Sequence, residues 1–196
     1  LLTIKKNIDS KRLVGERTTM NYQHEFRNIG MRLSQNLSKE DWVEIFKELT
    51  FWELEIEKSG EESVEEILAM QKQEANTQFF RFVKEHYKSW INGLDAPLLS
   101  HNLIRNNVIP HLVDNTPLYF VLIDNLRYDQ WKIIEPMLIN DFRIKKEQIY
   151  YSILPTATQY SRNAIFSGLL PAEMEKRFPG KWKNDEDEGG KNMYEK

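Results

Sequence analysis

The chain has 196 residues, with 27 lysine and arginine side chains, 30 aspartate and glutamate side chains and a formal net charge of −3. It contains no cysteine, which excludes disulfide bonds and thiolate metal sites and fits a reducing, cytoplasmic setting. The charge shows none of the basic excess expected of a domain that binds duplex nucleic acid. The longest apolar run, residues 118–123, is too short to span a bilayer.

The first residues of the chain suggest that it is part of a longer protein. There is no initiator methionine, and the first residues open inside a helical pattern without the features of a signal peptide. We therefore expect a piece of a longer protein.

Residues 1–95 are predicted to form an α-helical three-helix bundle. Apolar residues recur at helical spacing in three segments: residues 3–36, 39–57 and 62–92. The sequence from Ser38 to Asp41 resembles a capping box that opens the second helix, and Gly93 suits a helix C-cap. Phe51 and Trp52 are adjacent, so one of them must face away from the core, where it could mark a dimer or inter-domain surface.

Residues 96–196 are predicted to form an α/β domain. Strands are expected at 118–124 and 148–154, each followed by a helical stretch, at 130–141 and 160–170. Strand–helix–strand–helix order is typical of a mostly parallel, doubly wound sheet. Ser100 is expected to cap a short helix near residues 101–113.

Two polar side chains follow the predicted strands at their carboxyl ends, where such sheets gather functional groups. Asp124 could bind a divalent cation, or it could cap the next helix or begin a turn. Asn125 tolerates a left-handed backbone, which predicts a sharp turn. Thr158 precedes a helix, and from position alone it is either an N-cap or a nucleophile that needs a base or a metal for activation.

Two further residues are candidates for binding substrate. Arg127 could reach a phosphate, although an arginine at a helix start is also commonly solvated. Asn163 lies little more than one turn beyond Thr158, and a polar helix face is an equally good interpretation.

The segments VLIDNLRYDQW and LPTATQYSRNAIFSGLLP resemble the PglZ domain of the alkaline phosphatase superfamily. This resemblance implies an alkaline-phosphatase-like fold and a site with two zinc ions. Within it Asp124 matches a zinc ligand, and Thr158, in the sequence Pro-Thr-Ala-Thr, matches the nucleophile, which also contacts the metal. Thr156 then belongs to the turn.

A helical bundle directly before a PglZ-like segment is similar to the PorX-type response regulators. The resemblance implies a two-component regulator whose effector domain is a zinc-dependent phosphodiesterase acting on oligonucleotides, linked to type IX secretion. It also implies a sensor histidine kinase and a sigma factor as partners, and a homodimer. The receiver and the C-terminal part of the PglZ domain are expected to lie outside this chain.

The four histidines, at positions 24, 86, 101 and 111, all precede Thr158, so the downstream metal ligands of the superfamily are missing from the chain. We therefore expect this piece alone to be inactive. The alternative is a non-catalytic signalling and dimerisation module that binds a sigma factor or a sensor.

Overall fold

The computed structural model describes the backbone of residues 2–113 and 115–183, and the side chains from residue 17 onward within those ranges. The chain divides into two compact units. Unit one comprises Leu1–Lys88 and Asn125–Lys145, and unit two comprises Ser89–Asp124 and Lys146–Lys196. The predicted domain boundary at residue 95 stays a prediction.

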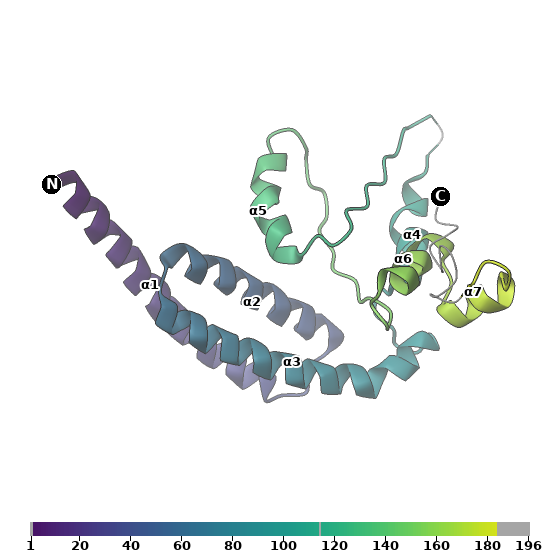
Figure 1. Cartoon of the computed structure of the whole chain (residues 1–196), viewed down its shortest axis with the longest axis horizontal. Helices are drawn as coiled ribbons and strands as arrows, with labels where there is room; N and C mark the ends of the chain where they lie inside the picture. The colour runs from purple at the N-terminus through teal and green to yellow at the C-terminus, as the bar shows by residue number, and fades with distance from the viewer. Residues whose placement is uncertain (1, 114, 184–196) are drawn as a thin grey trace. The chain divides into compact units, whose positions relative to one another are not determined.

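Three long helices make up most of unit one: α1 (Leu2–Leu33), α2 (Lys39–Ser59) and α3 (Glu62–Ile91), the last residues of which enter unit two (Figure 1). They lie where the apolar spacing predicts helices. The start of α2 is the predicted capping box: the Asp41 amide donates to Ser38 Oγ at 3.1 Å, and the Ser38 amide donates to Asp41 Oδ2 at 2.9 Å. These two bonds satisfy donors that a helix start leaves open.

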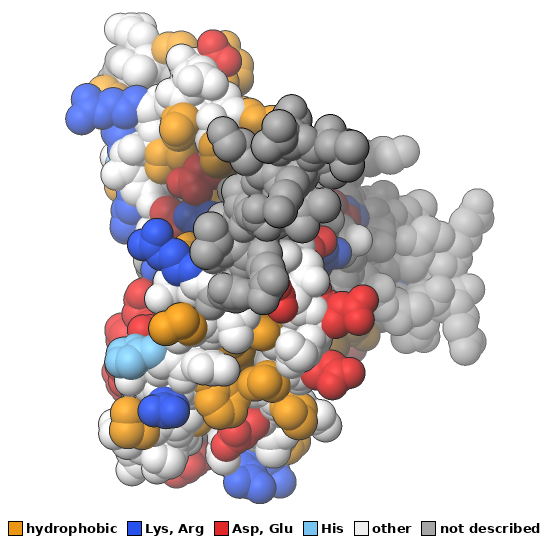
Figure 2. Space-filling model, turned by 90° about the vertical axis from the view of Figure 1, so that its left-hand side faces the viewer, with side chains coloured by type: hydrophobic (Ala, Val, Ile, Leu, Met, Phe, Trp, Pro, Cys, Tyr) orange, Lys and Arg blue, Asp and Glu red, His pale blue; other side chains and the backbone are white. Residues whose placement is uncertain are grey.

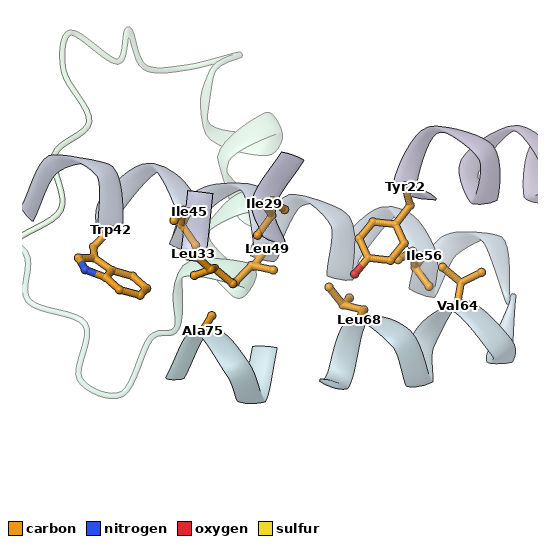
Figure 3. Packing of buried hydrophobic residues seen from close by; sticks show 10 residues of the cluster. All are labelled: Tyr22, Ile29, Leu33, Trp42, Ile45, Leu49, Ile56, Val64, Leu68 and Ala75. Carbon is orange, nitrogen blue, oxygen red and sulfur yellow. The ribbon is translucent and has the colours of Figure 1, made fainter. Parts of the chain in front are cut away.

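The core of unit one is built from all three helices (Figure 3). Its members share near-complete burial: Tyr22, Ile29, Leu33, Trp42, Ile45, Leu49, Ile56, Val64, Leu68 and Ala75. Removing these apolar side chains from water is what stabilises the packing of helices whose other faces are charged.

Aromatic residues on α2 divide between this core and the surface. Trp52 packs against the core, whereas Phe51 is 54% exposed, so the expectation that one of the pair faces away from the core is confirmed. The face shown in Figure 2 carries hydrophobic side chains interspersed with acidic and basic ones.

Helix α5 (Tyr128–Leu138) also belongs to unit one, with Pro136 inside it. Its first residue packs against α2: the rings of Tyr128 and Phe46 have centroids 5.5 Å apart. The sequence assigns this segment to the second domain, since nothing local indicates a contact across 82 positions.

Unit two contains short helical elements. In chain order they are η1 (Ser100–Asn102), α4 (Leu103–Asn107), η2 (Ile109–His111), α6 (Thr158–Ser167) and α7 (Pro171–Arg177). Its buried residues come from several of these and from the segments between them: Trp90, Leu99, Ser100, Ile153, Ala164, Ile165 and Met174. Helix α3 contributes Trp90 to this core and ends in a Schellman motif, in which the Gly93 amide (φ 78°) donates to Trp90 O and the Leu94 amide donates to Ser89 O.

The prediction of a mostly parallel sheet is wrong. The described residues form helices and no strand, and their β pairing is limited to one isolated parallel bridge between Leu99 and Tyr151. Residues 118–123, predicted as a strand buried on both faces, are exposed throughout. A strand is stabilised by a neighbouring strand, and within the described ranges no second strand lies beside this segment.

The predicted role of Ser100 is also wrong. Ser100 is the first residue of η1, and the preceding residue, Leu99, is the N-cap, with no side-chain cap bond. The Ser100 hydroxyl instead accepts a hydrogen bond from the Ile153 amide at 3.1 Å. The segment predicted as the second strand is therefore tied to residues 98–100, because the Tyr151 amide also donates to Leu98 O.

No helix within the described ranges has the length and apolar character required to cross a membrane.

Candidate functional site

Asp124 is joined to helix α6 by an ion pair. Arg162 Nη1 donates to Asp124 Oδ2 at 3.1 Å, and the two side chains are 26% and 60% exposed, respectively. Both residues belong to unit two. The pair therefore brings the end of the 118–124 segment to a helix that begins 34 positions later in the chain.

A second contact fixes the direction in which this segment runs along α6. The rings of Phe120 and Phe166 meet edge to face, with centroids 6.0 Å apart and an interplanar angle of 88°. Phe166, Arg162 and Thr158 are spaced four residues apart, which places them on one face of the helix. The segment therefore runs opposite to the direction of α6. Phe120 lies near the end of the helix at Phe166, and Asp124 lies closer to its start, at Arg162.

The next position on that face is Thr158. Four helical residues rise about 6 Å, so Thr158 lies about one turn beyond the residue that holds Asp124. The structure thereby attaches Asp124 to α6 at Arg162, four residues after Thr158 in the helix.

Thr158 is the first residue of α6, and the N-cap is Ala157, which makes no side-chain cap bond. The N-cap interpretation of Thr158 therefore does not describe this helix start. The preceding turn is held by Ser161, whose hydroxyl donates to Thr156 O at 3.1 Å. Thr158 is a half-buried residue at the N-terminus of this helix, where partial positive charge favours an anion.

Asn125 has φ 60°, as expected for a left-handed turn residue, so the chain turns sharply directly after Asp124. Asp124 ends the first segment of unit two, and Asn125 begins the second segment of unit one.

The two candidate substrate-binding residues make local contacts. Asn163 Nδ2 donates to Gln159 O at 2.7 Å, one turn earlier in α6. Arg127 belongs to unit one, where Nε and Nη2 donate to the two oxygens of Asp129 at 3.0 and 2.7 Å. These bonds lower the pKa of the Asp129 carboxyl and raise the pKa of the Arg127 guanidinium.

Arg162 is the residue that the sequence-based reasoning missed. Its partner is 38 positions away, and neither helical spacing nor a motif links the two. One signal was present: the spacing of 158, 162 and 166 puts an arginine on the face of the candidate nucleophile.

His101 is the histidine with the most distinctive surroundings. Its ring Nδ1 is buried and makes no hydrogen bond within the described part of the chain. Burial lowers its pKa, while the nearby Glu173 carboxylate opposes that shift. Across the described ranges, histidine and acidic side chains form no group of three or more that could hold a metal ion.

Comparison with protein-family models finds two matches. Residues 12–91 match the PorX response regulator linker domain, which covers most of α1, all of α2 and all of α3. Residues 103–196 match the BREX system PglZ alkaline phosphatase-like domain, which includes both Asp124 and Thr158. A search of the curated proteins found no match.

Proposed function

This chain belongs to the PorX-type response regulators, with a linker domain followed by an alkaline phosphatase-like effector domain, and on that premise we propose that the effector is a zinc-dependent phosphodiesterase. The substrate class is an oligonucleotide. The observation that supports the proposal is the ion pair between Asp124 and Arg162, a residue of the helix that begins with Thr158.

In the proposed reaction Thr158 is the nucleophile. Its hydroxyl oxygen forms a bond to the phosphorus of a phosphodiester, the bond to the leaving oxygen breaks, and the hydroxyl proton is lost to a base or to solvent. Water then cleaves the phosphothreonine and regenerates the hydroxyl. The N-terminal end of α6 supports this chemistry because its partial positive charge stabilises a phosphoryl group at Thr158.

The zinc requirement is part of the proposal. A carboxylate and an ionised hydroxyl are oxygen ligands that zinc accepts, so Asp124 and Thr158 fit as two members of a ligand set. Bound zinc would lower the pKa of the threonine hydroxyl. The remaining ligands lie, in this proposal, outside the described residues.

We also propose a biological setting, which follows from membership of the PorX-type response regulators. The protein acts in the cytoplasm as a homodimer, receives phosphate from a sensor histidine kinase, works with a sigma factor, and regulates type IX secretion. If it proves to be a non-catalytic module that binds such a partner, Thr158 will have no role in phosphodiester hydrolysis.

The test compares T158V, T158S and T156V in the intact protein, with hydrolysis of a short oligonucleotide as the readout. T158V removes the nucleophilic oxygen at nearly constant volume, T158S retains it, and T156V is the matched control in the same turn. We expect hydrolysis only in the variants that keep a hydroxyl at position 158, and a chelator should abolish it in those as well. Hydrolysis by T158V at the parent rate would remove Thr158 from the mechanism.

A further inference from the structure

We propose that Phe46 of the linker domain holds helix α5 of the effector domain, and that this contact is a releasable connection between the two domains. The family matches place α2 in the linker domain and α5 in the effector domain, whereas the structure groups both helices in unit one. A stretch of the effector domain, residues 125–145, therefore packs with the linker helices. The inference does not depend on the reaction proposed for Thr158.

Helix α5 needs a neighbour to stay helical. It has 11 residues and contains Pro136, which lacks a backbone donor and crowds the preceding turn. Helices of this length are only marginally stable in water on their own, so most of their stability comes from packing one face. Half-buried side chains recur at helical spacing along one face of α5, at positions 128, 131, 132, 135 and 138.

The neighbour is α2. The rings of Tyr128 and Phe46 have centroids 5.5 Å apart and are tilted by 40° to each other. One turn later in α5, Lys132 Nζ lies 5.3 Å from the centroid of the Tyr128 ring. The Tyr128 ring thus contacts α2 through Phe46 and its own helix through Lys132.

Charge favours the same arrangement. Glu53 lies seven residues after Phe46, on the same face of α2. The pKa of the Arg127 guanidinium is raised mainly by its bonds to Asp129 and further by the Glu53 carboxylate. Arg127 and Tyr128 are consecutive, so the start of α5 is attracted to α2 both by charge and by the ring contact.

Phe46 can be changed without opening the bundle. It is 47% exposed, and among the described residues it belongs neither to the core of unit one nor to the side chains packed against that core. The neighbouring positions Ile45 and Leu49 fill the core instead. The ring of Phe46 therefore serves the contact with α5 rather than the packing of the three long helices.

The alternative is that α5 merely lies beside α2 and that the ring contact contributes nothing to its order. The two explanations differ in what they predict for the backbone of α5. If Phe46 holds the helix, its loss lets α5 open more often while the linker core stays closed.

The experiment measures amide hydrogen exchange in the intact protein for F46A, Y128A and the double variant. F51A is the matched control, because Phe51 lies on the same helix, is 54% exposed and packs its ring on the adjacent Trp52. Exchange is followed in two places: the amides of α5, and the core amides of α2 and α3.

We expect F46A and Y128A each to speed the exchange of the α5 amides by about 2- to 10-fold, as the loss of one aromatic pair should. The core amides of α2 and α3 should keep the protection they have in the parent protein. F51A should behave as the parent protein in both places, and F46A should have no further effect in the Y128A background.

Three results would overturn the proposal: α5 exchange that F46A leaves unchanged, effects of F46A and Y128A that multiply in the double variant, or an acceleration in the linker core equal to that in α5. Failure of the proposed function has a different signature, because hydrolysis would then survive T158V. The exchange measurement still decides the role of Phe46 in that case, since it reports on α5 directly.

Discussion

The hydroxyl of Ser100 accepts a hydrogen bond from the backbone amide of Ile153 at 3.1 Å, and neither residue has any exposed surface. This bond joins two segments 53 positions apart, just before the turn that leads to Thr158. A side chain here takes the place of a sheet partner, because it satisfies a buried amide that has no strand beside it.

Ser100→Ala should therefore destabilise unit two. The substitution leaves the Ile153 amide buried without a partner, which costs about 1–3 kcal/mol. Amide hydrogen exchange measures this directly, and we expect faster exchange at Ile153. Ser152→Ala is the control, because Ser152 is half-buried and its hydroxyl donates to the Ile153 carbonyl rather than accepting from the Ile153 amide. Equal protection of the Ile153 amide in S100A and the parent protein would show that the bond contributes nothing.

Tyr22→Phe should destabilise unit one. The Tyr22 hydroxyl donates to Gln71 Oε1 at 3.0 Å, and Gln71 Nε2 donates to Phe26 O at 2.9 Å, so both side chains are satisfied inside the core. Without the hydroxyl the glutamine oxygen is buried without this donor, at a cost of about 1–3 kcal/mol in the free energy of unfolding. Denaturant unfolding measures the change.

The control for this variant is Tyr119→Phe, at a side chain that is 87% exposed, where a change within about 0.5 kcal/mol is expected. If Y22F unfolds at the same denaturant concentration as Y119F, the buried bond does not stabilise the core.

Burial also raises the pKa of Tyr22 to about 12. Its folded pKa lies above the unfolded value of 10.0, so its contribution to stability is complete below pH 10.0 and is lost as the pH rises toward 12.

Acid should weaken unit two through His101. Burial lowers the pKa of this imidazole from its usual 6.5, so the unfolded chain binds a proton more readily than the folded one. The contribution of the neutral His101 ring to the free energy of unfolding is then fully present above pH 6.5, and it is lost as the pH decreases through the folded pKa. His101→Gln should flatten this dependence in urea unfolding curves collected across the acidic range.

His24→Gln is the matched control, because the His24 side chain is 76% exposed. It should leave the pH dependence as it is in the parent protein. A wild-type stability that stays constant below pH 6.5, or a slope that persists in H101Q, would contradict the assignment to His101.

The features that local sequence determines were predictable. The helix start at Ser38 depends on side chains three residues apart, and the helix end at Gly93 depends on one residue that tolerates positive φ. Asn125 is a similar case. Each of these requires only neighbours along the chain, which is why the pattern alone indicates them.

The features that depend on distant residues were not predictable. An apolar run such as 118–123 has the composition of a buried strand, but a strand also needs a partner, and that is not a property of the run itself. The sequence placed Ser100 as a cap because it precedes a short helix, whereas its actual partner is Ile153. In the candidate site, Asp124 and Thr158 followed from position and resemblance, and the contact between Asp124 and Arg162 did not.

The most direct test of this account is the rate of oligonucleotide hydrolysis by the intact, zinc-loaded protein carrying Thr158→Val, compared with Thr156→Val. Loss of a nucleophile that forms a covalent intermediate typically costs on the order of 10³-fold or more. We predict a loss of that size for T158V and a rate close to that of the parent protein for T156V. Equal rates for T158V and the parent protein would contradict the proposal that Thr158 is the nucleophile.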